Sequence, residues 1–163
     1  MDAKSIDEHN PKIKLNSGQL IPQVGLGVYK LNGESAEPLI LSAFEAGYRR
    51  IDTAAFYGNE AQVGSAVRNS GLAREEIFIT TKIWKDDHGF DRALAAIDES
   101  LARLNIDYID MLLIHWPSPQ LNKFVDTWAA FKQAHQSGKI RGIGVSNFQP
   151  AHLEQLLAAG GIV

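Results

Sequence analysis

Short apolar segments that end in a polar residue recur along this chain at a nearly constant interval. Asp52, Lys82, His115 and Ser146 each end such a segment, and they are separated by 30, 33 and 31 residues. A strand joined to a parallel neighbour through a crossover helix produces repeats of this kind. One eighth of a typical (β/α)8 barrel is also about 31 residues. The spacing therefore indicates an α/β fold of parallel strands, and it favours a barrel over a doubly wound sheet, whose units are usually less uniform in length.

Five segments are predicted to be strands because they are short, apolar and rich in β-branched residues. They are residues 24–29, 48–52, 77–82, 108–115 and 140–146. Before them, residues 12–22 are expected to form a β-hairpin around Ser17 and Gly18. We therefore predict one α/β domain of the (β/α)8 type over residues 12–163, with about five βα units after the hairpin, and a polar N-terminal segment over residues 1–11. Because eight units close a barrel, five leave either an open sheet or one that is completed from elsewhere.

Between the strands, apolar residues follow the period of amphipathic helices. Leu94, Ile97, Leu101 and Leu104 are spaced by 3, 4 and 3 residues, and Asp91 before them is a candidate N-cap. A second set, in which Gly138 is placed to end the helix, is Phe124, Trp128 and Phe131. Further helices are expected from Pro38 to Gly47 and from Pro150 to Gly160.

Charge and cysteine content exclude several classes of function. The chain has 16 Lys and Arg against 19 Asp and Glu, so it has no excess of cations with which to bind nucleic acid or anionic membranes. Without cysteine, it has no disulfide, thiolate nucleophile or cysteine-ligated metal. Its five histidines are scattered, and no metal site is predicted. The polar N-terminal residues lack a secretory signal and no apolar run is long enough to span a bilayer, so we expect a cytoplasmic protein.

The polar residues at the strand ends are candidates for chemistry, because (β/α)8 barrels carry their active sites at the C-terminal ends of the strands. Taken singly, each has an ordinary structural explanation, such as a capping carboxylate or a packed tyrosine. Together they suit proton transfer to a carbonyl oxygen. A carboxylate keeps a lysine charged, an ammonium beside a phenol favours the phenolate, and a histidine can orient the same oxygen. Because side chains supply no hydride, a nicotinamide cofactor would be needed. The candidates are Tyr29, Asp52, Tyr57, Lys82, His115 and Ser146.

Four longer segments closely resemble the aldo-keto reductase family. They are GYRRIDTAAFYGNEAQVGSA (47–66), IFITTKIW (77–84), NIDYIDMLLIHWP (105–117) and KIRGIGVSNF (139–148). The resemblance extends from about Lys12 onward, and the compact GLGVYKL segment (25–31) is most similar to bacterial members, including 2,5-diketo-D-gluconate reductases. It implies a (β/α)8 barrel that uses NADPH to reduce an aldehyde, ketone or sugar carbonyl to an alcohol.

The resemblance also implies roles for individual residues. Tyr57 would be the general acid, with Lys82 and its partner Asp52 beside it, and His115 would orient the carbonyl. The residues implied in cofactor binding are Val28, Tyr29, Asp52, Ser146 and Asn147, and those implied in substrate binding are Tyr29, Trp84, His115 and Trp116. In the family, a C-terminal third adds contacts to the nicotinamide and to the adenosine 2′-phosphate, and this sequence has no counterpart of it.

Two readings of function therefore stay open. The first is an NADPH-dependent oxidoreductase acting on a small carbonyl compound. The second is a truncated, inactive relative that serves as an interaction module or is a non-functional fragment. In either case an open sheet edge is expected to favour self-association or pairing with a complementing chain. A Rossmann-type dehydrogenase is disfavoured, because Gly25 and Gly27 are followed by Lys30 where that motif needs a third glycine.

Overall fold

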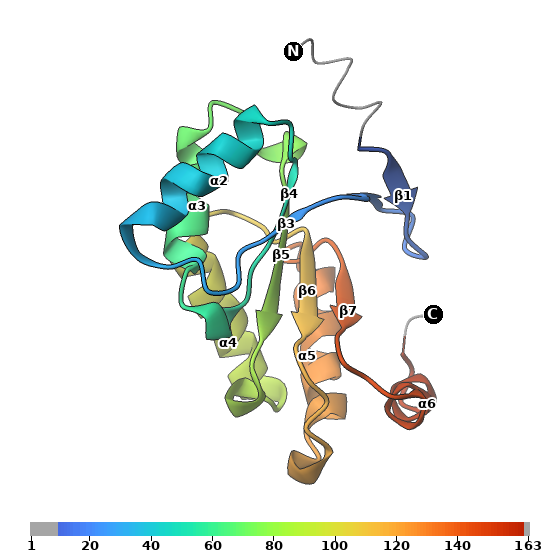
Figure 1. Ribbon diagram of the computed structural model, residues 1–163. Helices are drawn as coiled ribbons and strands as arrows, with labels where there is room; N and C mark the ends of the chain where they lie inside the picture. The colour runs from blue at the N-terminus through green and yellow to red at the C-terminus, as the bar shows by residue number, and fades with distance from the viewer. Residues whose placement is uncertain (1–9, 162–163) are drawn as a thin grey trace.

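A parallel sheet of five strands forms the centre of the molecule (Figure 1). The computed structural model describes residues 10–161, and within them the sheet has the order β3-β4-β5-β6-β7. Neighbours in the sheet are thus neighbours in the sequence, as in a barrel built from successive βα units. The prediction of an α/β fold with about five βα units is confirmed. The strands are β3 (Leu26–Gly27), β4 (Arg50–Asp52), β5 (Phe78–Ile83), β6 (Met111–Ile114) and β7 (Ile143–Val145).

The predicted N-terminal hairpin is also present. Strand β1 (Lys12–Lys14) pairs antiparallel with β2 (Leu20–Pro22), and Gly18 in the turn has a φ of 86°, which glycine adopts at little cost. The side chain of Gln19 donates a hydrogen bond to the backbone carbonyl of Asp110, just before β6 (3.0 Å). The hairpin therefore lies at the amino ends of the parallel strands (Figure 1), away from the ends that were predicted to carry the chemistry.

Helices connect the successive parallel strands, and α2 to α5 lie along one side of the sheet (Figure 1). Gly47, Gly138 and Gly160 follow the ends of three of them with φ of 97°, 80° and 78°, as the sequence predicted. One helical expectation is wrong. Asp91 is not an N-cap, because Gly89 has that position and Asp91 lies in the first turn, where its carboxylate is favoured by the helix dipole. The helices are α2 (Ala36–Glu45), α3 (Glu60–Asn69), α4 (Phe90–Leu104), α5 (Phe124–Gln136) and α6 (Pro150–Ala158).

Most of the predicted strands are shorter than expected. Of residues 24–29, only Leu26–Gly27 form a strand, and residues 108–115 give β6 with a separate bridge between Ile109 and Ile140. Val28 shows why the prediction went too far: it is fully buried but lies outside the strand. An apolar pattern reports burial, whereas a strand continues only while both backbone groups pair with its neighbour. The Val28 carbonyl instead accepts from the Leu31 N–H and from the Asn59 side chain.

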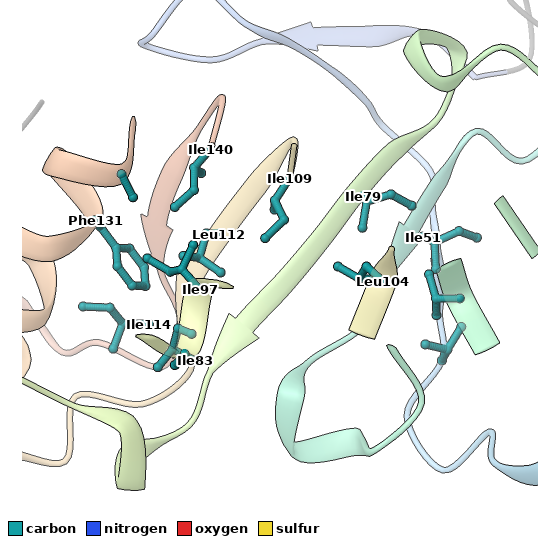
Figure 2. Packing of buried hydrophobic residues seen from close by; sticks show 14 of the residues in the cluster. Ile51, Ile79, Ile83, Ile97, Leu104, Ile109, Leu112, Ile114, Phe131 and Ile140 are labelled. Atoms are coloured by element: carbon teal, nitrogen blue, oxygen red, sulfur yellow. The ribbon is translucent and has the colours of Figure 1, made fainter. Parts of the chain in front are cut away.

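The core lies between the sheet and helices α2 to α5 (Figure 2). Strand residues Ile79, Leu112 and Ile114 are fully buried there with the helix residues Ile97 and Phe131. Each such side chain contributes roughly 1.5–3 kcal/mol through its burial. The packed layer gives the strands fixed positions, and hence fixes the loops that follow them.

Helices α3 and α4 approach each other so closely that only glycine fits between them. A Cβ atom added at Gly64 would lie 1.8 Å from the backbone carbonyl oxygen of Leu104. Helix α3 was not predicted from the sequence, although it follows directly from the loop of Tyr57.

Strand register brings three of the predicted site residues to one face of the sheet. Asp52 is paired with Thr80, and Lys82 is paired with Leu113. Because side chains alternate between the faces of a strand, Lys82 shares the face of Thr80, and His115 shares that of Leu113. Asp52, Lys82 and His115 therefore lie at the C-terminal edge of the sheet, on the face opposite the helices.

Candidate active site

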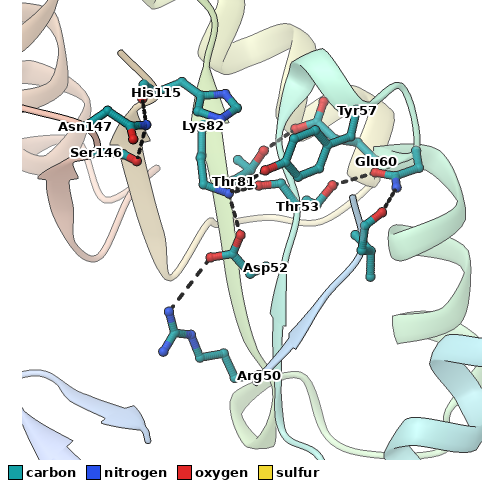
Figure 3. Close-up of polar contacts among 12 residues, drawn as sticks. Arg50, Asp52, Thr53, Tyr57, Glu60, Thr81, Lys82, His115, Ser146 and Asn147 are labelled. Atoms are coloured by element: carbon teal, nitrogen blue, oxygen red, sulfur yellow. Dashed lines mark hydrogen bonds and ion pairs between the residues drawn. The ribbon is translucent and has the colours of Figure 1, made fainter. Parts of the chain in front are cut away.

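The ammonium group of Lys82 is the centre of a cluster of polar side chains (Figure 3). Lys82 is only 6% exposed, and its Nζ donates to a carboxylate oxygen of Asp52, to the backbone carbonyl of Thr53 (2.8 Å) and to the hydroxyl of Tyr57 (3.5 Å). A lysine ammonium has three donors, so these three acceptors satisfy it without water. The other carboxylate oxygen of Asp52 lies 3.8 Å from a guanidinium nitrogen of Arg50.

Tyr57 lies in a short 3₁₀ turn, Ala55–Tyr57, in the loop after β4. Its ring is half-buried and has Lys82 Nζ 5.0 Å from its centroid. The ring centroid of Tyr29 is 5.0 Å away, and that of His115 is 5.7 Å away at nearly a right angle. The phenol therefore lies where the loops after β3 and β4 and the end of β6 meet.

His115 directly follows β6, where its backbone N–H donates to the carbonyl of Ile83 (3.1 Å). The residue is buried, and its Nδ1 atom has no hydrogen-bond partner among the described residues. Burial, the largest cause, and the charge of Lys82 together lower the pKa of His115 to about 4, although Asp52 opposes the shift. The imidazole is therefore neutral at neutral pH, with one nitrogen as donor and the other as acceptor.

Ser146 and Asn147 follow β7 and lie beside His115 (Figure 3). The Ser146 N–H donates to the carbonyl of Ile114 (2.9 Å), and the Asn147 amide donates to the carbonyl of His115 (2.8 Å) and to the Ser146 hydroxyl (3.0 Å). Asn147 donates both of these hydrogen bonds through its amide nitrogen, so its amide oxygen takes part in neither of them. These groups fit a ligand that carries a carboxamide, such as the nicotinamide end of the expected cofactor.

Aromatic side chains surround the cluster. Trp84 follows β5. Its ring makes an edge-on contact with the ring of His115, with 5.1 Å between centroids, and it stacks on Phe56 with 4.1 Å between centroids. Tyr29 is 59% exposed and Trp116 is 46% exposed, so both present rings to an incoming molecule. Phe56, which is 52% exposed, was not predicted as a site residue. Its position next to Tyr57 was the available signal in the sequence.

The structure limits how Val28 could contact a cofactor. Its side chain is fully buried in the hydrophobic core, so only its backbone can face a cofactor. That backbone is held in place, because the Val28 N–H donates to the carbonyl of Asp52 (3.0 Å). Tyr29, the next residue of this loop, is 59% exposed.

A buried carboxylate behind the site was also missed. Glu60 is 1% exposed and accepts hydrogen bonds from the Thr81 hydroxyl (2.6 Å) and from Nε of Arg103 (2.7 Å). It therefore ties the start of α3 to β5 and to α4. Its only signal in the sequence was its place in the GNEAQVGSA segment.

Two kinds of feature are absent from residues 10–161. They contain no group of three or more His, Cys, Asp or Glu side chains arranged to hold a metal ion. None of their helices has the length and apolar character needed to cross a membrane.

The parallel βα fold and the polar cluster around Lys82 point to one class of protein. Residues 23–162 match the aldo/keto reductase family, and the chain belongs to that family. It is 54% identical over 154 residues to an aldo-keto reductase of Mycolicibacterium smegmatis, covering 94% of this chain and 56% of the relative. It is 51% identical over 146 residues to the glyoxal reductase of Bacillus subtilis, covering 89% and 52%. The methylglyoxal reductase DkgA of Escherichia coli is 46% identical over 150 residues, covering 92% and 54%.

Solved structures agree with this assignment. An aldo/keto reductase from Brucella melitensis superposes with a TM-score of 0.91 at 47% identity, covering 94% of this chain and 60% of that chain. A mutant of Gox0644 in complex with NADPH gives 0.89 at 38% identity, covering 94% and 55%. The chain therefore spans about half the length of the curated relatives that it matches.

Proposed function

We propose that this chain carries the proton-transfer half of an NADPH-dependent carbonyl reductase, in which an aldehyde, ketone or sugar carbonyl becomes an alcohol. The observation that carries the proposal is the position of Lys82 Nζ, which contacts both Asp52 and the hydroxyl of Tyr57. A buried ammonium next to a phenol stabilises the phenolate that remains after a proton has been given away.

Tyr57 donates its hydroxyl proton to the carbonyl oxygen of the substrate. Lys82, kept charged by Asp52, stabilises the negative charge that proton donation leaves on the tyrosine oxygen. His115, neutral because burial lowers its pKa to about 4, offers a hydrogen bond that orients the same carbonyl oxygen. When NADPH is bound, it supplies the hydride that completes the reduction.

The cofactor would be held at its nicotinamide end by Ser146 and Asn147, whose hydroxyl and amide groups suit a carboxamide. Tyr29 would line the same space from the loop after β3, together with the backbone of Val28. Asp52, 28% exposed at its side chain, would line the cofactor site from the sheet.

The substrate would enter between aromatic rings, those of the exposed Tyr29 and Trp116 and of the partly buried Trp84. Two relatives are named a glyoxal reductase and a methylglyoxal reductase. Small aldehydes with a neighbouring carbonyl are therefore the first substrates to test, and methylglyoxal is the probe.

A fluorescence titration of the 163-residue chain with NADPH, with NADH in parallel, tests the proposal, and circular dichroism checks that the chain is folded. Saturable binding at micromolar concentration or below is expected. Tyr57→Phe should then lower methylglyoxal reduction by about 10²–10⁴-fold, with an NADPH Kd within about twofold of the original, because only the proton donor is lost. A folded chain that does not bind NADPH would overturn the proposal and favour the inactive interaction module.

We further propose that the open edge of β7 pairs with a second copy of this chain. Among residues 10–161, β7 is hydrogen-bonded to β6 alone, and Leu153 and Leu157 on the following helix are 41% and 48% exposed. Leu112 donates to the Gly142 carbonyl and Ser146 donates to the Ile114 carbonyl, so by strand alternation the backbone groups of Val145 face the open edge.

Light scattering after size-exclusion chromatography is expected to give a dimer. Val145→Pro removes an outward N–H and should shift the dimer towards monomer. A compact monomer at high concentration would contradict association, and capture of a complementing chain would replace the second copy as partner. The cytoplasmic location stays a prediction.

A further inference from the structure

Asn59 is a buried amide whose hydrogen bonds join two loops beside the active site. The residue is 1% exposed. Its Nδ2 donates to the backbone carbonyls of Val28 and Leu31 (2.8 Å each), and its Oδ1 accepts from the Thr53 hydroxyl (2.6 Å). Both donors of the amide are used, and both bind backbone carbonyls of the same loop. The chemistry proposed above does not use this residue.

The first of these loops is the turn formed by residues 28–31. Leu31 N–H donates to the Val28 carbonyl (3.1 Å), and Lys30 inside the turn has a φ of 64°. A residue other than glycine is strained at positive φ, and such strain persists only where neighbouring bonds enforce it. Asn59 holds the carbonyls at both ends of this turn and thereby enforces it.

The turn carries Tyr29 towards the site. Tyr29 lies between the two carbonyls that Asn59 binds, and its ring centroid is 5.0 Å from that of Tyr57. On its other side, Asn59 accepts from Thr53, whose own backbone carbonyl accepts from Lys82 (2.8 Å). One amide therefore connects the turn of Tyr29 to a residue that binds the central ammonium.

We propose that Asn59 is a positioning residue that fixes the turn 28–31 over the active site, so that Tyr29 is already held beside Tyr57 when a ligand arrives. The identity of that ligand rests on the proposed function, whereas the clamp on the turn does not. Asn59 acts through the backbone carbonyls of Val28 and Leu31 and touches no reacting atom.

Amide hydrogen exchange measured by NMR tests the clamp without any cofactor. Asn59→Asp keeps the size of the side chain and the acceptor for Thr53, but it places an oxygen where the two carbonyls need a donor. The Leu31 amide should then exchange at least about tenfold faster than in the original chain, because a typical hydrogen bond is worth about one order of magnitude in such an equilibrium.

Thr127→Val is the matched control. Thr127 is fully buried, and its hydroxyl donates to the Lys123 carbonyl (2.9 Å) and accepts from the Gly89 N–H (2.9 Å), away from the turn. This variant loses bonds of the same kind and should leave Leu31 exchange within about twofold of the original chain. Equal Leu31 protection in Asn59→Asp and Thr127→Val would overturn the proposal.

Thr53→Val and Thr53→Ser keep the proposal testable if Asn59→Asp does not fold. Valine replaces the hydroxyl that donates a hydrogen bond to Asn59 Oδ1, and serine keeps that hydroxyl. Leu31 exchange should rise in Thr53→Val and return towards the original in Thr53→Ser. If the two variants exchange alike, the link between Thr53 and the turn is refuted.

A kinetic measurement separates positioning from general stability. If the chain reduces methylglyoxal, Asn59→Asp should raise the KM for NADPH by about tenfold and change kcat by less than about threefold, because Tyr57 and Lys82 are untouched. A fall confined to kcat would contradict the proposal. A chain that binds no NADPH would refute the proposed function, while the exchange experiment would still decide the role of Asn59.

Discussion

The side-chain amide of Asn147 donates a hydrogen bond to the backbone carbonyl of His115, with 2.8 Å between nitrogen and oxygen. This bond joins the loop after β7 to the end of β6. Asn147 makes it from a left-handed conformation, with a φ of 63°. The loop of Ser146 and Asn147 therefore has a strained backbone, and the side-chain bond to the residue that bears the imidazole helps to enforce it.

Substitutions at Asn147 separate these two contributions. Asn147→Gly loses the bond to His115 but adopts positive φ freely, whereas Asn147→Ala loses the bond and keeps the strain. We expect alanine to lower the free energy of unfolding by about 1 kcal/mol more than glycine does. Urea unfolding followed by circular dichroism measures the difference, and equal stability of the two variants would show that the left-handed conformation is not retained.

The ion pair of Lys82 and Asp52 should respond unequally to loss of either partner. Asp52→Ala leaves an ammonium that is 8% exposed at its side chain, and we expect a loss of about 3 kcal/mol in the free energy of unfolding. Lys82→Met leaves a carboxylate that is 28% exposed and still 3.8 Å from Arg50, so about 1 kcal/mol is expected. Urea unfolding of both variants is the measurement. A larger loss in Lys82→Met would show that the ammonium is more solvated than its burial indicates.

The low pKa of His115 makes stability depend on pH. The unfolded chain takes up a proton at this histidine below its ordinary pKa of 6.5, and the folded chain does so only near its lowered pKa of about 4. Between these values the unfolded state binds more protons, so the folded state loses stability as the pH falls, by on the order of 2 kcal/mol.

His115→Gln isolates this contribution. The stability advantage of the original chain over the variant should shrink as the pH is lowered from 7 to 4.5 in urea unfolding. His88 is also buried, and burial lowers its pKa, but it is present in both chains and its effect cancels in the comparison. Parallel pH curves would refute the lowered pKa of His115.

Arg103 and Arg92 both form ion pairs, but only one of them neutralises a buried group. Arg103→Met would leave the carboxylate of Glu60, 1% exposed, without its cation, and we expect a loss of about 3 kcal/mol. Arg92→Met would leave Asp87 and Glu99, which are 22% and 48% exposed, so the loss should stay below about 1 kcal/mol. Thermal and urea unfolding measure both, and equal losses would show that Glu60 does not depend on Arg103.

The architecture was predictable because it rests on periodic signals. The interval between Asp52, Lys82, His115 and Ser146 reports the length of one βα unit, and a unit of fixed length returns each strand end to the same edge of the sheet. The glycines at helix ends were predictable for a similar reason, since positive φ has few other occupants. Strand ends were predicted poorly, as Val28 shows, because its side chain is buried like that of a strand residue although its carbonyl bonds to Asn59 and not to the neighbouring strand.

The polar groups behind the site were not predictable in this way. Asn59 and Glu60 read as ordinary loop and helix residues, and their roles depend on Val28, Thr81 and Arg103, which lie 21 to 43 positions away in the sequence. Phe56 was missed because an aromatic residue in a turn is compatible with either packing or exposure. Pairings of this kind follow from the completed packing of the units, and no local pattern encodes them.

The agreement between strand order and sequence order has a consequence for folding. Each strand of the parallel sheet finds its partner in the strand before it, so the sheet can grow by addition of one βα unit at a time, with short loops to close at every step. If the sheet grows in this way, Asp52 and Tyr57 would be placed first, Lys82 next, and His115 and Asn147 last. The hydrogen bond from Asn147 to the His115 carbonyl would then form only once β7 is in place.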